Sequence, residues 1–400
     1  MTKVGGKKVF VGLSGGVDSA VSAALLKQNG YDVTAVFIKV WQPDWIECNW
    51  KEERKEAMRV AAHLNIPFFT LDLVKEYKRG VIDYMISEYC LGRTPNPDVM
   101  CNREVKFGAF WQWAKSKGAD YVATGHYAQR VPIISSSARQ SVFVSLRSTS
   151  RKSTLVSACD GNNRDANKDC GYKMLAGNDA NKDQSYFLWT LNQNDLSHTL
   201  FPVGHLQKSE VRELAKKFDL PNAEKKDSQG LCFIGKVDVK EFLAHYIDTR
   251  PGNVLSENGT IIGTHSGALF FTIGERRGFT ITAKSPSDRP YYVISKDMDA
   301  NTITVSDRTN LKEKSQHITT ISRINWTGKF NWQKFQTADK NKFPLQARIR
   351  YRQELQNIKI LSEHASALEI SFEKKQDTLT SGQSLVIYNG NECLGGGIID

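Results

Sequence analysis

Residues 7–19, KKVFVGLSGGVDS, decide the fold, because a short apolar run there breaks into a glycine turn that leads straight into a helix. Residues 8–11 have the composition of a buried strand, and residues 17–28 carry apolar side chains at helical spacing. Gly15 and Gly16 permit backbone angles that are closed to other residues. The backbone N–H groups of such a turn, at the positive end of a helix dipole, suit a phosphate group. The stretch therefore predicts a phosphate-binding loop.

Three polar side chains in the same turn strengthen this prediction. Ser14 and Ser19 bring hydroxyl donors, and the carboxylate of Asp18 is a candidate ligand for a Mg²⁺ ion that bridges phosphates. The simpler alternative is an ordinary strand-to-helix turn with a capping Ser or Asp. We favour phosphate binding because two glycines, two serines and an aspartate fall within six residues at the end of the first strand.

Two other motifs compete for these residues. A Walker-type loop is excluded because no lysine follows Gly16 in the turn. The stretch GLSGG at residues 12–16 does match the G-x-S-x-G elbow of hydrolases, with Ser14 as nucleophile. That elbow needs an acid and a histidine downstream, and neither His205 nor His265 comes with a supporting pattern. A serine hydrolase is therefore the less favoured interpretation.

The composition sets wider limits. Four hundred residues with 40% apolar content are enough for two or three domains with their own cores. No apolar run is long enough to cross a bilayer, so we expect no membrane association. The net charge of +11 favours a polyanionic partner. Seven cysteines without a C-x-x-C pair argue against a disulfide framework and a zinc ribbon, so we expect no permanently bound metal. We also expect a monomer.

The N-terminal half alternates between strand-like and helix-like segments. Residues 31–40 and 68–73 have the composition of strands, and residues 51–64 and 75–88 that of helices. This alternation predicts a parallel sheet covered by helices, which binds nucleotides at the carboxyl ends of its strands. The first strand begins within ten residues of Met1, so we expect neither a presequence nor a signal peptide.

A loop with two prolines then leads into a further helix, in the stretch GRTPNPDVMCNREVKF at residues 92–107. Asp98 and Cys101 are three positions apart near its start, so their side chains can share one face. A thiol near a helix N-terminus with Arg and Lys close by has a lowered pKa, although a half-buried structural cysteine is the simpler alternative. A second cysteine, Cys232, lies between two glycines in residues 226–235, which suits a flexible loop.

The rest of the chain divides into three parts. Residues 131–181 are rich in Ser, Asn, Asp and Lys, which predicts a surface insertion of low complexity. Short alternating strands and turns predict a small β-rich middle domain at residues 223–290 and a C-terminal β-barrel at residues 291–400. In the sequence RIRYR at residues 348–352, a strand period of two would place three arginines on one face, which suits RNA phosphates.

The stretch SGGVDS, at residues 14–19, resembles the loop of the PP-loop ATP pyrophosphatase superfamily, whose members adenylate an oxygen of the substrate and release pyrophosphate. The stretch NPDVMCNREVKF, at residues 96–107, is similar to the signature of the tRNA-specific 2-thiouridylases, which place sulfur on the wobble uridine of the anticodon. Further motifs of that family follow in order: TGHYA at 124–128, KDQSYFL at 182–188, the cysteine at 232 and RYR at 350–352.

This resemblance implies an α/β fold, with a PP-loop domain at residues 1–222, a tRNA-adaptor middle domain and a tRNA-binding barrel. It implies ATP binding by Gly12, Leu13, Ser14, Gly15, Gly16, Val17, Asp18, Ser19, Ile38 and Gly125. It implies tRNA contacts by Asn96, Pro97, Asp98, His126, Lys182, Asp183, Gln184, Arg350, Tyr351 and Gln383. Ile38 departs from the methionine that the family commonly has there, and we expect only a small change in ATP affinity.

The resemblance also implies a mechanism. Asp98 takes part in acid/base catalysis while ATP adenylates O2 of the uracil ring, Cys232 carries a persulfide, and Cys101 forms a disulfide with it. The implied partners are tRNA, a persulfide donor or relay protein, and an external reductant. The insertion at residues 131–181 favours a eukaryotic, mitochondrial member, with a cytoplasmic one as the alternative. A PP-loop enzyme of the 4-thiouridine or amide-forming type, and a tRNA-binding module without catalysis, are the competing interpretations.

Overall fold

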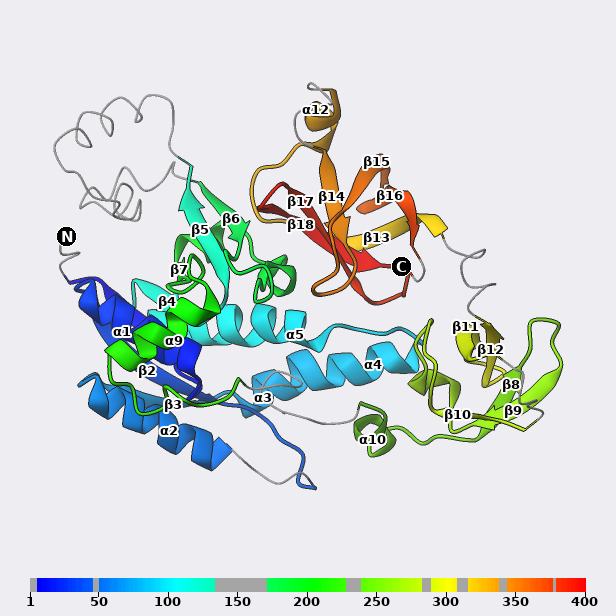
Figure 1. The fold of residues 1–400 in the computed structure, drawn as a ribbon, viewed down its shortest axis with the longest axis horizontal. Coiled ribbons are helices and arrows are strands. Elements are labelled where there is room, and N and C mark those ends of the chain that lie inside the picture. The colour runs from blue at the N-terminus through cyan, green and yellow to red at the C-terminus, as the bar shows by residue number, and fades with distance from the viewer. Residues whose placement is uncertain are drawn as a thin grey trace.

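The computed structural model describes residues 6–45, 50–133, 171–227, 239–282, 289–307, 316–337, 344–376 and 379–400. The described strands form three sheets. Figure 1 shows the N-terminal sheet and its helices at one end, the middle sheet at the other end, and the C-terminal strands above the helices between them. In the part of the chain that the structure describes, no helix is both long and apolar enough to span a bilayer.

Five parallel strands form the first sheet, in the order β3-β2-β1-β4-β7. They are β1 (Lys8–Gly12), β2 (Asp32–Lys39), β3 (Phe68–Asp72), β4 (Tyr121–Ala123) and β7 (Thr199–Leu200). Successive side chains of a strand point to opposite faces, so Val9 and Val11 enter one apolar core and Phe10 enters another. Both faces of the sheet are therefore covered, and the predicted α/β architecture is confirmed.

Helices cover each face. One face packs against α1 (Val17–Gln28), α2 (Trp50–His63) and α9 (Lys208–Lys217). The other packs against α3 (Val74–Tyr77), η1 (Lys78–Asp83), α4 (Tyr84–Cys90), α5 (Pro97–Met100), η2 (Cys101–Ala109) and α6 (Phe110–Ser116). The last three form one helical segment whose middle part, η2, is a π-helix, a geometry often found at functional sites.

The middle sheet has the order β10-β9-β8-β12-β11 and follows α10 (Val239–Ala244). Its strands are β8 (Gly252–Leu255), β9 (Ile261–His265), β10 (Phe279–Ile281), β11 (Tyr291–Asp297) and β12 (Thr302–Asp307), with η6 (Ala268–Phe270) after β9. The predicted domain boundary after residue 290 is wrong, because β12 pairs with β8 and places Thr302 opposite Asn253. Residues 291–307 therefore belong to the middle sheet and not to the barrel.

The C-terminal strands close into a six-stranded barrel, because β13 pairs with both β16 and β18. The barrel strands are β13 (Gln316–Trp326), β14 (Leu345–Arg348), β15 (Gln356–His364), β16 (Ala367–Gln376), β17 (Ser384–Asn389) and β18 (Glu392–Ile399), with α12 (Trp332–Thr337) between β13 and β14. A hairpin from the N-terminal part, β5 (Ala128–Pro132) and β6 (Tyr172–Ala176), extends this sheet through a pairing of β6 with β18.

The position of β6 corrects the predicted insertion. Residues 172–176 form a strand inside the range 131–181, so the low-complexity insertion does not extend to residue 181. Residues 134–170 lie outside the described residues. After β6 the chain forms η5 (Ser185–Leu188) and α8 (Gln193–Ser197) before it returns to the first sheet.

The predicted basic strand face at residues 348–352 is wrong. The strand β14 ends at Arg348, whose side chain is buried, and the next residues form a turn. Arg352 has a φ of +63°, in the left-handed region, which no regular strand contains. The period of two ends because Arg348 is held inside the protein, whereas Arg350 and Arg352 are exposed.

Candidate active site

The turn after β1 depends on one glycine more than on the other. Gly15 has a φ of +78°, in the region that favours glycine, whereas Gly16 has an ordinary φ of −83°. A Cβ at Gly15 would also lie 2.8 Å from the carbonyl oxygen of Glu53 in α2. The helix α1 begins at Val17, so its first N–H groups, which have no partner within the helix, face this turn.

The two serines of the turn contact each other. Their Oγ atoms are 3.3 Å apart, and Ser19 Oγ also donates to the carbonyl oxygen of Gly16 at 3.0 Å. The backbone N–H of Ser14 donates to Ser19 Oγ at 3.3 Å. These hydrogen bonds fix the positions of both hydroxyl groups within the turn. Among the described residues, no histidine bonds to Ser14, although a serine hydrolase would require one.

Gly125, which follows β4, touches the start of α1. A Cβ at this position would lie 2.7 Å from the backbone nitrogen of Ser19 and 2.8 Å from the carbonyl carbon of Asp18. Such an approach of two backbones is open only to glycine. Leu13, Val17 and Ile38 lie around the same edge of the sheet and are buried, and Gly12 is the last residue of β1. The residues that the resemblance assigns to ATP therefore lie together at one edge of the sheet.

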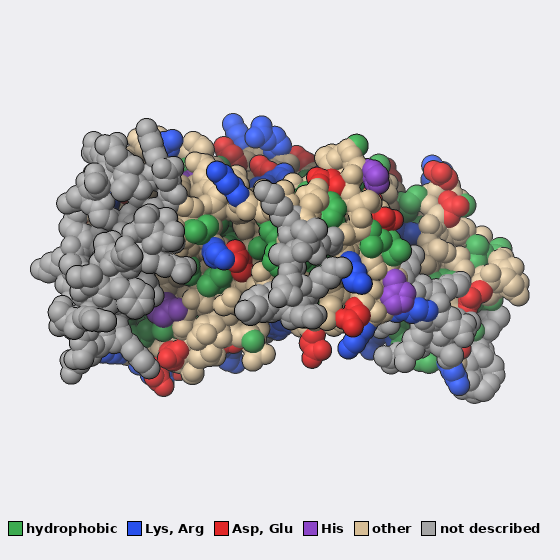
Figure 2. Space-filling model, turned by 90° about the horizontal axis from the view of Figure 1, so that it is seen from above, with side chains coloured by type: hydrophobic (Ala, Val, Ile, Leu, Met, Phe, Trp, Pro, Cys, Tyr) green, Lys and Arg blue, Asp and Glu red, His purple; other side chains and the backbone are tan. Residues whose placement is uncertain are grey.

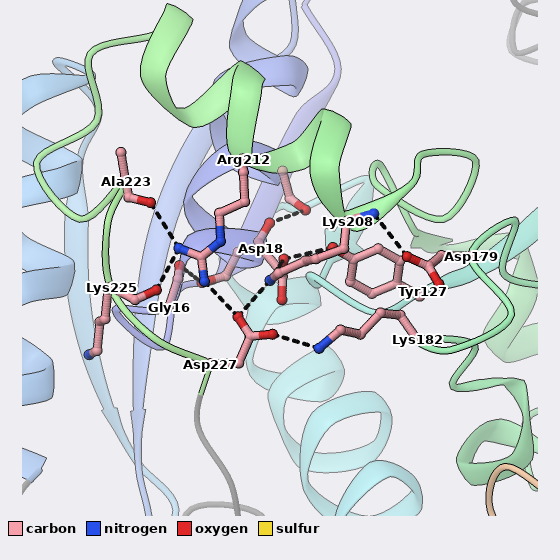
Figure 3. Close-up of polar contacts among 12 residues, drawn as sticks. Gly16, Asp18, Tyr127, Asp179, Lys182, Lys208, Arg212, Ala223, Lys225 and Asp227 are labelled. Carbon is pink, nitrogen blue, oxygen red and sulfur yellow. Dashed lines mark hydrogen bonds and ion pairs between the residues drawn. The ribbon is translucent and has the colours of Figure 1, made fainter.

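Asp18 is the centre of a polar network (Figure 3). Its Oδ1 accepts hydrogen bonds from Tyr127 Oη at 2.8 Å and from Lys208 Nζ at 2.6 Å. The same Nζ lies 2.8 Å from Oδ1 of Asp227, so one ammonium group lies between two carboxylates. Burial and the neighbouring Asp18 raise the pKa of Tyr127, which keeps its hydroxyl protonated and able to donate.

Asp227 is held by three cations. Besides Lys208, its carboxylate lies 2.6 Å from Lys182 Nζ and 2.9 Å from Arg212 Nη2. Burial alone would raise the pKa of Asp227, but the hydrogen bonds from Lys182 and Lys208 lower it to about 2. Arg212 also donates to two carbonyl oxygens within residues 223–225. The carboxylate is therefore charged at neutral pH and ties residues 223–227 to α9.

Four members of this network, Tyr127, Lys208, Arg212 and Asp227, were not among the predicted site residues. The structure makes Lys208 the first residue of α9, where the positive end of the helix dipole disfavours a cation, and two carboxylates beside it compensate. The cap residue is Gln207, whose N–H donates to Glu210 Oε2 at 2.7 Å, and this start places Lys208 beside Asp18.

The helical segment with Cys101 begins in the proline-containing loop. Asn96 caps α5, with its Oδ1 accepting a hydrogen bond from the N–H of Val99 at 3.3 Å, and Pro97 is the first helical residue, where it needs no N–H donor. Asp98 follows in the first turn and is half-buried. Cys101 lies one turn later, and its side chain is completely buried. Its reactivity as a thiolate stays a prediction.

His126 connects this segment to the turn after β4. Its Nδ1 and Thr124 Oγ1 are 2.7 Å apart, and its Nε2 lies 3.4 Å from Lys106 Nζ of η2. The ring of Phe107, also in η2, lies 5.8 Å from the imidazole centroid. Burial, and then the positive charge of Lys106, hold the pKa of His126 well below its usual value, so the imidazole ring is uncharged at neutral pH. The buried ring serves packing here, and its predicted tRNA contact stays a prediction.

Cys232 lies outside the described residues, so its pairing with Cys101 stays a prediction. Two other cysteines are described: Cys90 is exposed in α4, and Cys393 is buried in β18. Burial raises the pKa of Cys393 to about 12, so this thiol is unreactive. Across the described ranges, no group of three or more His, Cys, Asp or Glu side chains is arranged to hold a metal ion.

The three residues Lys182, Asp183 and Gln184 point in different directions. Lys182 pairs with Asp227 in the network described above. Asp183 is buried and pairs with Arg348 of the barrel at 2.5 Å. Gln184 accepts a hydrogen bond from the backbone N–H of Tyr127 at 3.0 Å. All three make internal contacts, so their assignment to tRNA stays a prediction.

The barrel residues assigned to tRNA contact different parts of the N-terminal domain and the middle sheet. Gln383 Nε2 donates to the carbonyl oxygen of Thr94 at 2.8 Å, and the ring of Tyr351 lies 4.7 Å from that of Phe187. A cavity of about 430 Å³ opens between the middle sheet and the barrel. It is lined by Thr272, Ile273, Gly274, Glu275, Arg350, Thr380 and Gln383.

Surface charge alone does not locate an RNA-binding surface on the face shown in Figure 2. Lys and Arg side chains lie there among Asp and Glu side chains over the described residues. On this face the described Lys and Arg side chains alternate with acidic ones and form no single continuous basic patch.

Three family models match successive parts of the chain. They are the tRNA methyl transferase HUP domain over residues 7–236, the tRNA methyl transferase PRC-barrel domain over residues 240–307, and the aminomethyltransferase beta-barrel domain over residues 316–399. The second range includes β11 and β12, in agreement with the pairing of the middle sheet. The predicted fold class is thereby confirmed along the chain.

Curated relatives match over nearly the whole length. The chain is 39% identical to the tRNA-specific 2-thiouridylase MnmA of Flavobacterium johnsoniae, over 98% of this chain and 100% of that protein. It is 40% identical to the enzymes of the same name from Shouchella clausii, over 98% and 96% of the two chains, and from Streptococcus mutans, over 100% and 97%. The chain therefore belongs to the tRNA-specific 2-thiouridylases, a family of ATP-dependent sulfurtransferases that thiolate uridine in tRNA.

Proposed function

We propose that this chain uses ATP to adenylate O2 of the wobble uridine and then replaces that oxygen with sulfur. The uracil oxygen attacks the α-phosphorus, and pyrophosphate leaves at the turn between β1 and α1. The contact of Gly125 with Asp18 and Ser19 carries this proposal, because it joins the turn to the strand end that leads, through His126, to η2. Phosphate site and cysteine-bearing helix thus share one edge of the sheet.

The same edge fits a Mg²⁺ ion that arrives with ATP. Asp18 and Asp227 both lie within 3 Å of the ammonium of Lys208, at 2.6 and 2.8 Å, so positive charge is stabilised between them. Magnesium in nucleotide sites is held by one or two carboxylates together with phosphate oxygens and water. We propose Asp18 as the carboxylate ligand. The ion would offset the charge on the departing pyrophosphate.

Asn96, Pro97 and Asp98 are proposed to hold the target base outside the anticodon stack. Unstacking a base costs about a few kcal/mol, which contacts with the RNA backbone must offset. Asp98 is half-buried at the first turn of α5, where the helix dipole stabilises its carboxylate. We propose that it accepts and returns the ring proton as O2 becomes a nucleophile and then a leaving group.

Sulfur transfer is proposed to use both cysteines. A donor or relay protein loads Cys232 with a persulfide, whose terminal sulfur attacks C2 of the adenylated uridine while AMP leaves with the former O2. The thiolate of Cys101 then attacks the inner sulfur of Cys232, which releases the 2-thiouridine and leaves a disulfide between the two cysteines. An external dithiol supplies the two electrons that restore both thiols. Release of hydrosulfide from the persulfide before attack on C2 is the alternative order.

We further propose that the protein acts in mitochondria and as a monomer. Support for the compartment is the Ser-, Asn- and Lys-rich stretch within residues 131–181. The named relatives are bacterial, so the compartment rests on this stretch alone. The cytoplasm is the alternative.

Mass spectrometry of anticodon nucleosides tests this proposal. Cells that lack the protein are expected to lose 2-thiouridine from the wobble position of mitochondrial tRNAs, while cytoplasmic tRNAs keep theirs. Re-expression of the chain should restore the modification. Loss confined to cytoplasmic tRNAs would contradict the compartment, and loss of 4-thiouridine instead would contradict the site of sulfur insertion.

A further inference from the structure

One buried hydroxyl group touches three segments that the resemblance assigns to tRNA. Tyr186 lies in η5, and its side chain is 1% exposed. Its Oη is 3.0 Å from the carbonyl oxygen of Ile349 and 2.9 Å from that of Ser384, and it donates to these two acceptors. Ile349 directly precedes Arg350, and Ser384 directly follows Gln383. The hydroxyl therefore lies between the two barrel segments that carry these residues.

The third segment is the loop before α5. The helix α5, which Asn96 caps, packs against η5, and the side chain of Asn96 acts on the Tyr186 hydroxyl in the direction opposite to burial, which raises the pKa of Tyr186. Asn96 Oδ1 already accepts from the N–H of Val99, so its amide N–H₂ is the group available to the tyrosine oxygen. The phenol group of Tyr186 thus lies beside the cap of α5 and shares its single O–H between carbonyl oxygens of the two barrel segments.

A buried ion pair holds the same junction from the other side. Arg348 Nη2 lies 2.5 Å from Asp183 Oδ2 and 2.7 Å from Tyr388 Oη, and Ser185 Oγ donates to the same Asp183 oxygen at 3.0 Å. All four side chains are buried. Because a buried charge pair has few alternative partners, it restricts how η5 and the barrel sit relative to each other. Tyr186 therefore occupies a fixed place between them.

We propose that Tyr186 is a positioning residue, which sets the distance between the target-base loop at Asn96 and the barrel segments at Arg350 and Gln383. This inference rests on the proposed tRNA contacts of those three residues. A flipped base and its flanking backbone must be held at the same time, so the spacing of the two sets of contacts matters to the adenylation step. Tyr186 itself needs no contact with RNA.

Tyr186→Phe tests the proposal, because it removes one oxygen and keeps the ring in its apolar surroundings. We expect kcat/KM for tRNA to fall at least tenfold, and the Kd for ATP to stay within twofold. Thr327→Val is the matched control, since it removes one buried hydroxyl that donates to a carbonyl oxygen, that of Cys393 at 2.8 Å, within the barrel. The control is expected to keep kcat/KM for tRNA within twofold even if it melts at a lower temperature.

A double variant distinguishes a positioning role of Tyr186 from a general loss of rigidity in the fold. If Tyr186 acts through Asn96, adding Tyr186→Phe to Asn96→Ala should cost less than threefold beyond Asn96→Ala alone. Fully multiplicative losses, or equal losses in Tyr186→Phe and Thr327→Val, would overturn the proposal. The wild-type protein is assayed first for 2-thiouridine, so a failure of the proposed function would appear there and not in the variants.

Discussion

Replacing Cys101 by serine is expected to abolish thiolation while tRNA affinity stays within a few-fold. A serine hydroxyl has nearly the same size as the thiol, so the packing of η2 should survive, yet it can neither attack a disulfide nor form one. Cys232→Ser is expected to give the same result because it cannot carry a persulfide. Thiolation is measured as 2-thiouridine formed per enzyme with ATP, tRNA and a persulfide donor, and affinity by filter binding.

The remaining described cysteines provide controls for this experiment. Cys90→Ser changes an exposed thiol in α4, and Cys393→Ser changes a buried one in β18. Neither lies in the segment that follows Asn96, so both variants should thiolate at a rate within twofold of the wild type. Normal thiolation by Cys101→Ser would show that the two-cysteine scheme is wrong.

Gly125→Ala is expected to weaken ATP binding at least tenfold. The added Cβ would lie 2.7 Å from Ser19 N and 2.8 Å from the carbonyl carbon of Asp18, and both are backbone atoms that cannot rotate away. The first turn of α1 must therefore shift, which misplaces the N–H groups that bind phosphate. A tenfold loss corresponds to about 1.4 kcal/mol of binding free energy. Isothermal titration with a non-hydrolysable ATP analogue measures it.

A second glycine provides the control for this variant. At Gly328, a Cβ would have its nearest neighbour 3.6 Å away, in ordinary van der Waals contact. Gly328→Ala should therefore bind the ATP analogue as the wild type does. If Gly125→Ala bound the ATP analogue with wild-type affinity, nucleotide binding would not depend on the start of α1. The proposed location of the ATP site would then be wrong.

The sequence predicted correctly those helices and strands that depend on residues close together in the chain. The helix α1 has the predicted bounds because the glycine turn and the apolar spacing both act within a few residues. The same reasoning failed at Arg348, where a period of two continued in the sequence after the strand had ended. What ends the strand's regularity there is a buried contact with Asp183, 165 positions earlier, which no local pattern contains.

Long-range pairing also explains which site residues were missed. Asp18 and Lys208 are 190 positions apart, and their contact depends on how α9 packs beside α1. Asp183 and Gln184 were predicted from the family motif, and the structure shows internal partners for both side chains. A motif thus indicates that a residue matters, but only the fold shows whether its side chain faces a substrate or the protein interior.

Oxygen labelling of the target base tests adenylation of uracil O2 most directly. The wobble uridine of the tRNA substrate carries ¹⁸O at O2, and the AMP formed during thiolation is analysed by mass spectrometry. If ATP activates this oxygen, each 2-thiouridine formed should be matched by one AMP that contains one ¹⁸O atom. Unlabelled AMP, with the label recovered in water or in pyrophosphate, would contradict the account.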